Sequence, residues 1–193
     1  MRANSSSEIN HVAERQGALI RANIDLLLQG ITLLDEISDS AYRDPVPVLM
    51  MQRVGPQLRH VLEFYQCFLD GLESGHVDYD ARKRDELVEA SRTVATTKMY
   101  CLVARLRSLS VQKGDGVILT AMEDCPGDFP DRLLTSSVGR ELQVLCSHTI
   151  HHYALIAFIL AAHGVKVAKN FGVAPSTLRY RNQEIAPVIS EAA

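Results

Sequence analysis

The sequence contains few cysteines, and no two of them have the C-x-x-C spacing of a zinc knuckle or a redox-active dithiol. The four cysteines are scattered along the chain, at Cys67, Cys101, Cys125 and Cys146. Neither a cysteine-built zinc knuckle nor a dithiol redox site is therefore indicated. Reduced thiols in a cytoplasmic protein fit this pattern best.

Long apolar runs are also missing. The longest uninterrupted run is 153–162, whereas a helix needs about 20 apolar residues to span a bilayer. The first seven residues, Met-Arg-Ala-Asn-Ser-Ser-Ser, are polar and lack the apolar segment of a signal peptide. We therefore expect a cytoplasmic location and no membrane partner.

Positive charge is not in excess, because the net charge is -3 and no basic patch stands out. A nucleic-acid partner is therefore not expected. With 47% hydrophobic and 22% charged residues, the composition is that of an ordinary globular protein. A chain of 193 residues can build one well-buried core but is short for two, so we expect a single domain, 1–193.

Apolar residues spaced by three and four predict four long helices, with approximate bounds 9–38, 50–74, 85–110 and 136–164. The third helix has the least clear apolar face, and two registers fit it about equally well. No repeat of 20 to 50 residues is present. The predicted fold is therefore all-α, a four-helix bundle. Asn23 and Gln16 fall on the inner line of the first helix, where each needs a polar partner.

The segments between and after these helices are predicted to be less regular. The loop 76–85 is charged and is expected to be solvated. Residues 117–120 can pair with 129–134 around the Pro126-Gly127 turn, giving a short β-hairpin between the third and fourth helices. Ser136 or Ser137 then caps the fourth helix. Residues 165–193 are expected to form an irregular tail.

The fourth helix carries the stretch Ser-His-Thr-Ile-His-His-Tyr at 147–153. Residues four apart lie one above the other on a helix, so His148 and His152 can chelate one metal ion. The apolar stripe of the helix includes His152, with His148 beside it and His151 at its edge. The alternative is a pair of hydrogen-bonded core histidines, each of which needs a buried partner.

Several common catalytic motifs are missing around this pair. A zincin protease has a glutamate directly after its first histidine, and this position is Thr149 here. No G-x-S-x-G surrounds Ser147, and no glycine-rich phosphate loop is present. Proteases, elbow-type serine hydrolases and phosphate-loop enzymes are therefore disfavoured.

A long first helix, a histidine in the second (Gly-Pro-Gln-Leu-Arg-His-Val-Leu, 55–62) and His-x-x-x-His in the last resemble the DinB-like, or YfiT-like, superfamily. The resemblance covers about 9–164. It implies a four-helix bundle of down-up-up-down order in which three histidines bind a divalent metal. Carried over to this sequence, the ligands are His60, His148 and His152. By periodicity alone, His60 lies only at the rim of its helix face.

Three protein ligands leave an open coordination position, as is typical of catalytic rather than structural metal sites. Imidazoles accept zinc, nickel, iron or manganese, and the sequence does not select one. Glu141 and Glu63 lie close enough in sequence to be hydrogen-bond acceptors that orient a ligand ring.

Relatives in the superfamily include thiol-dependent S-transferases and metal-dependent hydrolases. The resemblance therefore implies such an enzyme, acting on a small-molecule substrate or a low-molecular-weight thiol. The alternative is a non-catalytic, dimeric bundle that binds a metal or small ligand. A polar, roomy pocket above the histidines favours the enzyme, whereas a site plugged by Phe64 or by the tail favours the binding protein.

Overall fold

The computed structural model describes residues 4–109, 116–121 and 133–185. Cys125, the predicted turn at 126–127 and most of the predicted strand 129–134 lie outside these residues, as does the end of the tail. Within them the chain is mostly helical, with one small sheet. This agrees with the all-α class in its coarse form.

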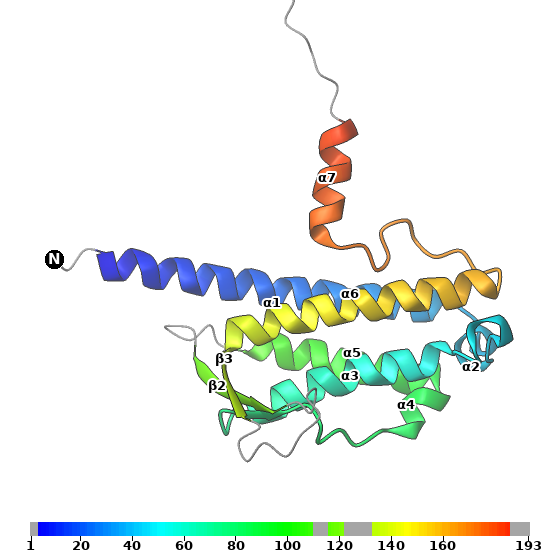
Figure 1. The fold of residues 1–193 in the computed structure, drawn as a ribbon, viewed down its shortest axis with the longest axis horizontal. Helices are drawn as coiled ribbons and strands as arrows, with labels where there is room; N and C mark the ends of the chain where they lie inside the picture. Colours follow the sequence, from blue (N-terminus) through cyan, green and yellow to red (C-terminus); the bar gives the residue numbers. More distant parts are fainter. Residues whose placement is uncertain (1–3, 110–115, 122–132, 186–193) are drawn as a thin grey trace, which may run out of the picture.

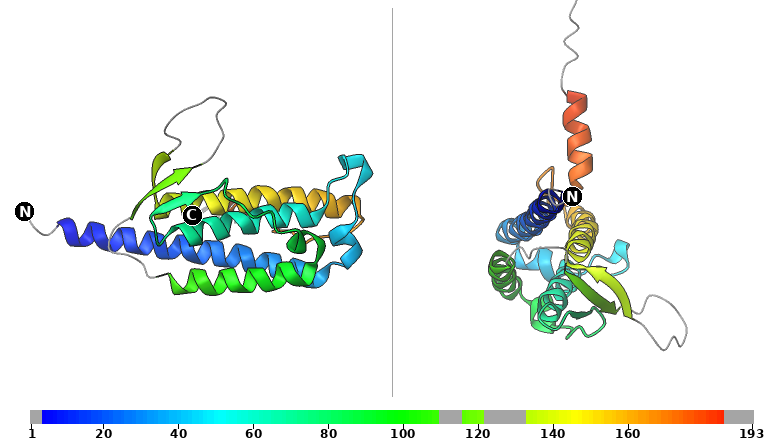
Figure 2. Two further views of the ribbon diagram at one scale, coloured as in Figure 1. Left: turned by 90° about the horizontal axis from the view of Figure 1, so that it is seen from below. Right: turned by 90° about the vertical axis from the view of Figure 1, so that its left-hand side faces the viewer.

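The four longest described helices lie side by side (Figure 1). They are α1 (Asn4–Glu36), α3 (Val54–Gly71), α5 (Arg92–Ser108) and α6 (Val138–Ala162). Helices α1 and α3 each contact both α5 and α6, and the end-on view in Figure 2 shows the four axes around one core. They correspond to the four predicted helices.

The helices α1 and α6 run in one direction, and α3 and α5 run in the other (Figure 1). After α1, the short helices α2 (Asp39–Arg43) and η1 (Pro47–Leu49) reverse the chain. After α3 the chain returns along that helix: Tyr79 stacks on Phe64, and Glu89 then pairs with Arg53 at the start of α3. This return makes α3 and α5 parallel, which gives the down-up-up-down order that the resemblance implies.

The predicted inward position of Asn23 is confirmed, because its side chain is fully buried. Its amide donates to the carbonyl of Leu142, and its oxygen accepts a hydrogen bond from the hydroxyl of Tyr65. The hydroxyl of Thr149 donates to the same tyrosine. This chain of hydrogen bonds ties α1, α3 and α6 together, and its member Thr149 directly follows His148 in the sequence.

The prediction of one continuous helix over 85–110 is wrong. The structure has α4 (Glu86–Ala90) and α5, separated at Ser91, whose backbone is extended at φ -134° and ψ 114°. The hydroxyl of Ser91 accepts from the Val94 amide, so a serine that could continue a helix caps a new one instead. Leu87 is 69% exposed on α4.

The prediction that 76–85 is a solvated loop is also wrong in part. Residues His76–Asp78 form β1, which pairs in parallel with β2 (Val117–Ala121). Val77 and Tyr79 are buried. A three-residue strand is too short to show an alternating pattern, so the sequence alone does not reveal it.

The predicted hairpin is present, because β2 pairs antiparallel with β3. The strand β3 spans Leu133–Ser137, so it extends beyond the predicted end at residue 134. Ser137 then caps α6 by accepting from the Arg140 amide, which confirms the predicted start of this helix.

The expectation of an irregular tail needs correction as well. Residues Pro175–Ile185 form α7, which projects away from the four helices (Figures 1 and 2). Before it, Phe171 is buried and stacks on Tyr153 with ring centroids 4.6 Å apart. This part of the tail is therefore packed on the helices rather than loose.

Two helical stretches, His11–Glu36 and Val138–Ala162, are long and apolar enough to cross a membrane by length and composition alone. Core helices of globular proteins pass the same test, and these two pack against each other. The finding is weak evidence for a membrane span, and the absence of a membrane partner stays a prediction.

We predict that Gly55→Ala destabilises the protein by about 1–3 kcal/mol, because overpacking against backbone forces the helices apart. A Cβ at this position would lie 2.1 Å from the carbonyl oxygen of Glu89, where α4 crosses α3. Gly17→Ala is the matched control, since its Cβ would meet only the flexible Arg21 side chain at 3.4 Å. That change should stabilise α1 by up to about 1 kcal/mol. Equal urea midpoints for the two variants would contradict the prediction.

Candidate metal centre

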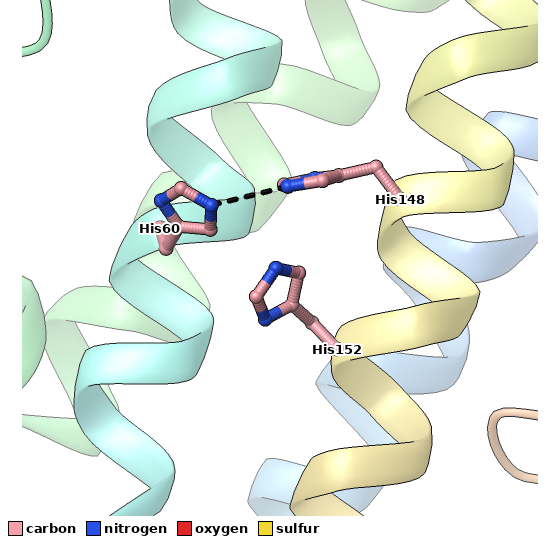
Figure 3. Close-up of side chains that lie close together, drawn as sticks. All are labelled: His60, His148 and His152. Atoms are coloured by element: carbon pink, nitrogen blue, oxygen red, sulfur yellow. Dashed lines mark hydrogen bonds between the residues drawn. The ribbon is translucent and has the colours of Figure 1, made fainter. Parts of the chain in front are cut away.

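Three histidine side chains converge between the antiparallel helices α3 and α6 (Figure 3). His60 extends from α3, and His148 and His152 extend from successive turns of α6. One ligand nitrogen can be taken from each ring so that all three lie within 4.8 Å of one another. The sequence-predicted ligands are thus brought together, including the one that periodicity placed at a rim.

The register of α6 explains why this pair faces α3. Leu145, Thr149 and Ile156 are buried, whereas His148 and His152 are half-buried beside them. His151 is exposed. The predicted preference for the pair His148 and His152 over His148 and His151 therefore agrees with the side-chain positions.

The residues fit a tetrahedral metal ion. Ligand nitrogens about 2.1 Å from zinc are roughly 3.4 Å apart in a tetrahedron. The Nε2 atoms of His60 and His148 are 3.1 Å apart, and the greatest separation in the set is 4.8 Å. Small rotamer changes would bring all three nitrogens to ligand distance.

Burial lowers the pKa of each ring, because it disfavours the charged imidazolium. The pKa of His148 falls to about 3, from burial and then from its neighbours His152 and His60. The pKa of His152 falls to about 4, from burial and then from His60. Burial, followed by the charge of Arg82, lowers the pKa of His60 to about 4. All three rings are therefore neutral near pH 7, the state in which imidazole binds metals.

Aromatic side chains cover one side of the centre. The ring of Phe64 stacks on His148 with centroids 4.1 Å apart and meets His60 edge-on at 4.8 Å. The ring of Tyr79 also stacks on Phe64, with ring centroids 4.9 Å apart. The described tail instead packs at Tyr153 and Gln29, away from the histidines. Phe64 thus limits access to His148, and the described part of the tail does not.

The second nitrogen of each ring has a different environment. The Nδ1 of His152 lies 2.7 Å from the Oε1 of Gln57, which can accept its proton. The Nδ1 of His60 lies 2.7 Å from Nη1 of Arg82, a donor. The Nδ1 of His148 is buried and has no hydrogen-bond partner among the described residues. Only His152 therefore has the acceptor that ligand imidazoles usually have.

The two predicted carboxylate acceptors bind elsewhere. Glu141 accepts hydrogen bonds from the hydroxyls of Tyr79 and Ser136. Glu63 accepts from the backbone amide of Asp85. Both side chains are buried, but they hold the return segment, residues 76–91 running back along α3, and the start of α6 rather than a histidine ring. Sequence reasoning missed Gln57, although it lies one turn before His60 and so could have been found by helical spacing.

Replacing Gln57 by leucine is expected to weaken metal binding by roughly 10- to 100-fold, because His152 loses the acceptor that fixes its ring. Gln66→Leu is the control, since this glutamine on the same helix donates to Asp70 instead. Zinc titration by calorimetry would measure both variants. An unchanged dissociation constant for Gln57→Leu would show that the amide does not orient the ligand.

No family model matches the sequence, and no solved structure matches the chain. Among curated proteins, FK506-binding protein 5 of Rhizopus delemar is 33% identical over 105 residues. These residues are 54% of this chain and 27% of that relative, so the chain spans only about a quarter of its length. This likeness does not bear on the resemblance to the DinB-like superfamily. The structure itself brings together three histidines that could bind a metal.

Proposed function

We propose that this protein is a DinB-like, metal-dependent enzyme of the thiol S-transferase or hydrolase type, acting on a small substrate. The observation that carries the proposal is the convergence of His60, His148 and His152, three neutral imidazoles from two facing helices. The order of helix directions adds support, because it is the order that the resemblance implies.

Three imidazole ligands leave one coordination position open to water or substrate. A divalent metal in such a site would lower the pKa of a bound thiol or water. The deprotonated group would then be available as a nucleophile near neutral pH. Zinc, nickel, iron or manganese would each suit this donor set.

The surrounding residues have separate roles in this proposal. The amide of Gln57 fixes the ring of His152 through its Nδ1. The buried ring of Phe64 excludes water from one side of His148. A desolvated site of this kind strengthens the electrostatic interactions within it.

The proposal is tested with protein purified without a histidine tag. We expect the protein to retain close to one equivalent of a divalent metal, measured by mass spectrometry. The metal-loaded protein should accelerate attack of 2-mercaptoethanol on 1-chloro-2,4-dinitrobenzene, or hydrolysis of 4-nitrophenyl acetate. The acceleration should disappear in His148→Ala. Protein that takes up no metal at micromolar concentration would overturn the proposal.

The second candidate is a non-catalytic protein that binds a metal or small ligand, with a second copy of the chain as its partner. The stacking of Phe64 on His148 favours it, because this contact narrows access to the site. Phe64→Ala separates the two candidates. An enzyme limited by access should react faster with the added space, whereas a binding protein should hold the same metal and remain inactive with both substrates.

A further inference from the structure

Arg82 lies at the edge of the histidine cluster on the segment between β1 and α4. A turn in which the side chain of Asp78 accepts from the amides of Asp80 and Ala81 directs the chain into this position. The Cζ of Arg82 lies 5.2 Å from the centre of the Phe64 ring, at cation–π distance. Its Nη1 lies 2.7 Å from Nδ1 of His60.

Arg82 differs from the other half-buried arginines of the described residues because it has no carboxylate partner. Four other arginines form ion pairs with carboxylates: Arg53, Arg59, Arg92 and Arg105. Among the described residues, no carboxylate oxygen lies within ion-pair distance of Arg82, although the side chain is half-buried. A half-buried guanidinium without a counter-ion is a ready site for an anion, since it prefers planar, charged acceptors.

The contact with His60 cannot persist when that ring binds a metal through Nε2. Arginine can only donate, so the Nδ1 of His60 must be the acceptor in the observed contact. A neutral ring that gives its Nε2 lone pair to a metal carries its hydrogen on Nδ1. Two donors would then face each other, and the guanidinium would have to leave.

We propose that Arg82 leaves the His60 ring when the metal binds and then holds the anionic group of an acidic substrate beside the open coordination position. The expected ligand class is a small molecule with a carboxylate, which can accept two parallel N–H bonds from a guanidinium. This proposal rests on the proposed function, because it places the substrate at the same metal.

The first test measures metal affinity, which does not depend on activity. Zinc titration of Arg82→Met by calorimetry should give about tenfold tighter binding than the unmodified protein, because a competing hydrogen bond and a nearby cation are both removed. Methionine keeps a long apolar chain over Phe64. Lys83→Met, which removes the adjacent exposed cation, should leave the affinity unchanged. Zinc binding that is equal or weaker in Arg82→Met would overturn the proposed displacement.

The second test measures anion preference in the cobalt-loaded protein, whose visible spectrum reports ligands at the metal. The probes are 3-mercaptopropionate and 3-mercaptopropan-1-ol, which differ in the terminal charge. The unmodified protein and Lys83→Met should bind the acidic thiol about tenfold more tightly, and Arg82→Met should lose this preference. Arg82→Lys should keep part of it, because the charge remains but the planar fork is lost.

The outcomes separate the role of Arg82 from the proposed function. Equal binding of both thiols by the unmodified protein would overturn the role of Arg82 and leave the proposed function standing. Failure of both zinc and cobalt to bind would overturn the proposed function itself, and the role of Arg82 with it. A preference that survives in Arg82→Met would assign anion recognition to another residue.

Discussion

Replacing His148 or His152 by alanine should abolish metal retention, whereas His151→Ala should leave it largely intact. Removing an acceptor beside a ligand already weakens binding by roughly 10- to 100-fold, so loss of a ligand ring should weaken it by more than about 100-fold. His151 is the matched control, because it lies on the same helix but is exposed. Metal content after gel filtration and zinc calorimetry would measure the effect.

The variant His60→Ala extends this test to α3. The ring of His60 lies 4.7–4.8 Å from the other two rings between centroids, so its loss should also weaken binding by more than about 100-fold. An equal loss in His151→Ala would show that the register of α6 is wrong. A crystal structure with metal on His148 and His152 but with His60 turned to solvent would refute the three-histidine site.

The helices α1, α3 and α6 were predictable because each carries a long apolar face, and such faces dominate helix packing. The face of α5 is less clear, and its start at Arg92 was not predicted. The break at Ser91 was not predictable, because serine is acceptable within a helix and becomes a cap only when the chain must turn from α4 into α5. The same limit applies to β1, whose three residues become a strand only beside β2. These features depend on where the return segment runs, which local sequence does not encode.

The residues of the site likewise divide into those that local spacing predicts and those that only the fold brings together. The i,i+4 spacing predicted the pair on α6, since both residues share one helix and one register. The position of His60 needed the resemblance, because its face is set by how α3 turns toward α6. Arg82 is 22 residues from His60 in sequence, and only the return of the chain along α3 brings it to the ring. Its role therefore could not be found by spacing.

The metal-free protein should lose stability as the pH falls from about 6.5 to about 4. The pKa values of His60 and His152 in the folded chain are about 4, and that of His148 is about 3, whereas an unfolded histidine titrates near 6.5. In this window the unfolded state binds more protons than the folded state, so falling pH favours unfolding. Above about pH 6.5 the penalty is absent, since both states are neutral.

Each ring contributes at most about 1.4 kcal/mol per pH unit, and solvent access to the half-buried rings reduces this figure. Urea unfolding followed by helical circular dichroism in the presence of a chelator, between pH 4.5 and 7.5, would measure the slope. His148→Leu should reduce the slope by about a third, because it removes one of three similar contributions. His151→Gln should leave it unchanged. A flat profile for the metal-free protein would show that the rings titrate alike in the folded and unfolded states, so that burial does not lower their pKa.

The same experiment shows whether the ion is structural. The core formed by residues such as Leu58, Leu62, Leu145 and Ile156 is buried without contribution from a metal. The folded state should therefore survive chelation at pH 7, and metal should add only the linkage term, about 2.7 kcal/mol at a hundred times its dissociation constant. Chelation should lower the melting temperature at pH 7 without loss of helical signal at room temperature. Complete unfolding on chelation would instead make the ion structural, as in a zinc finger, and would remove the main support for an open catalytic site.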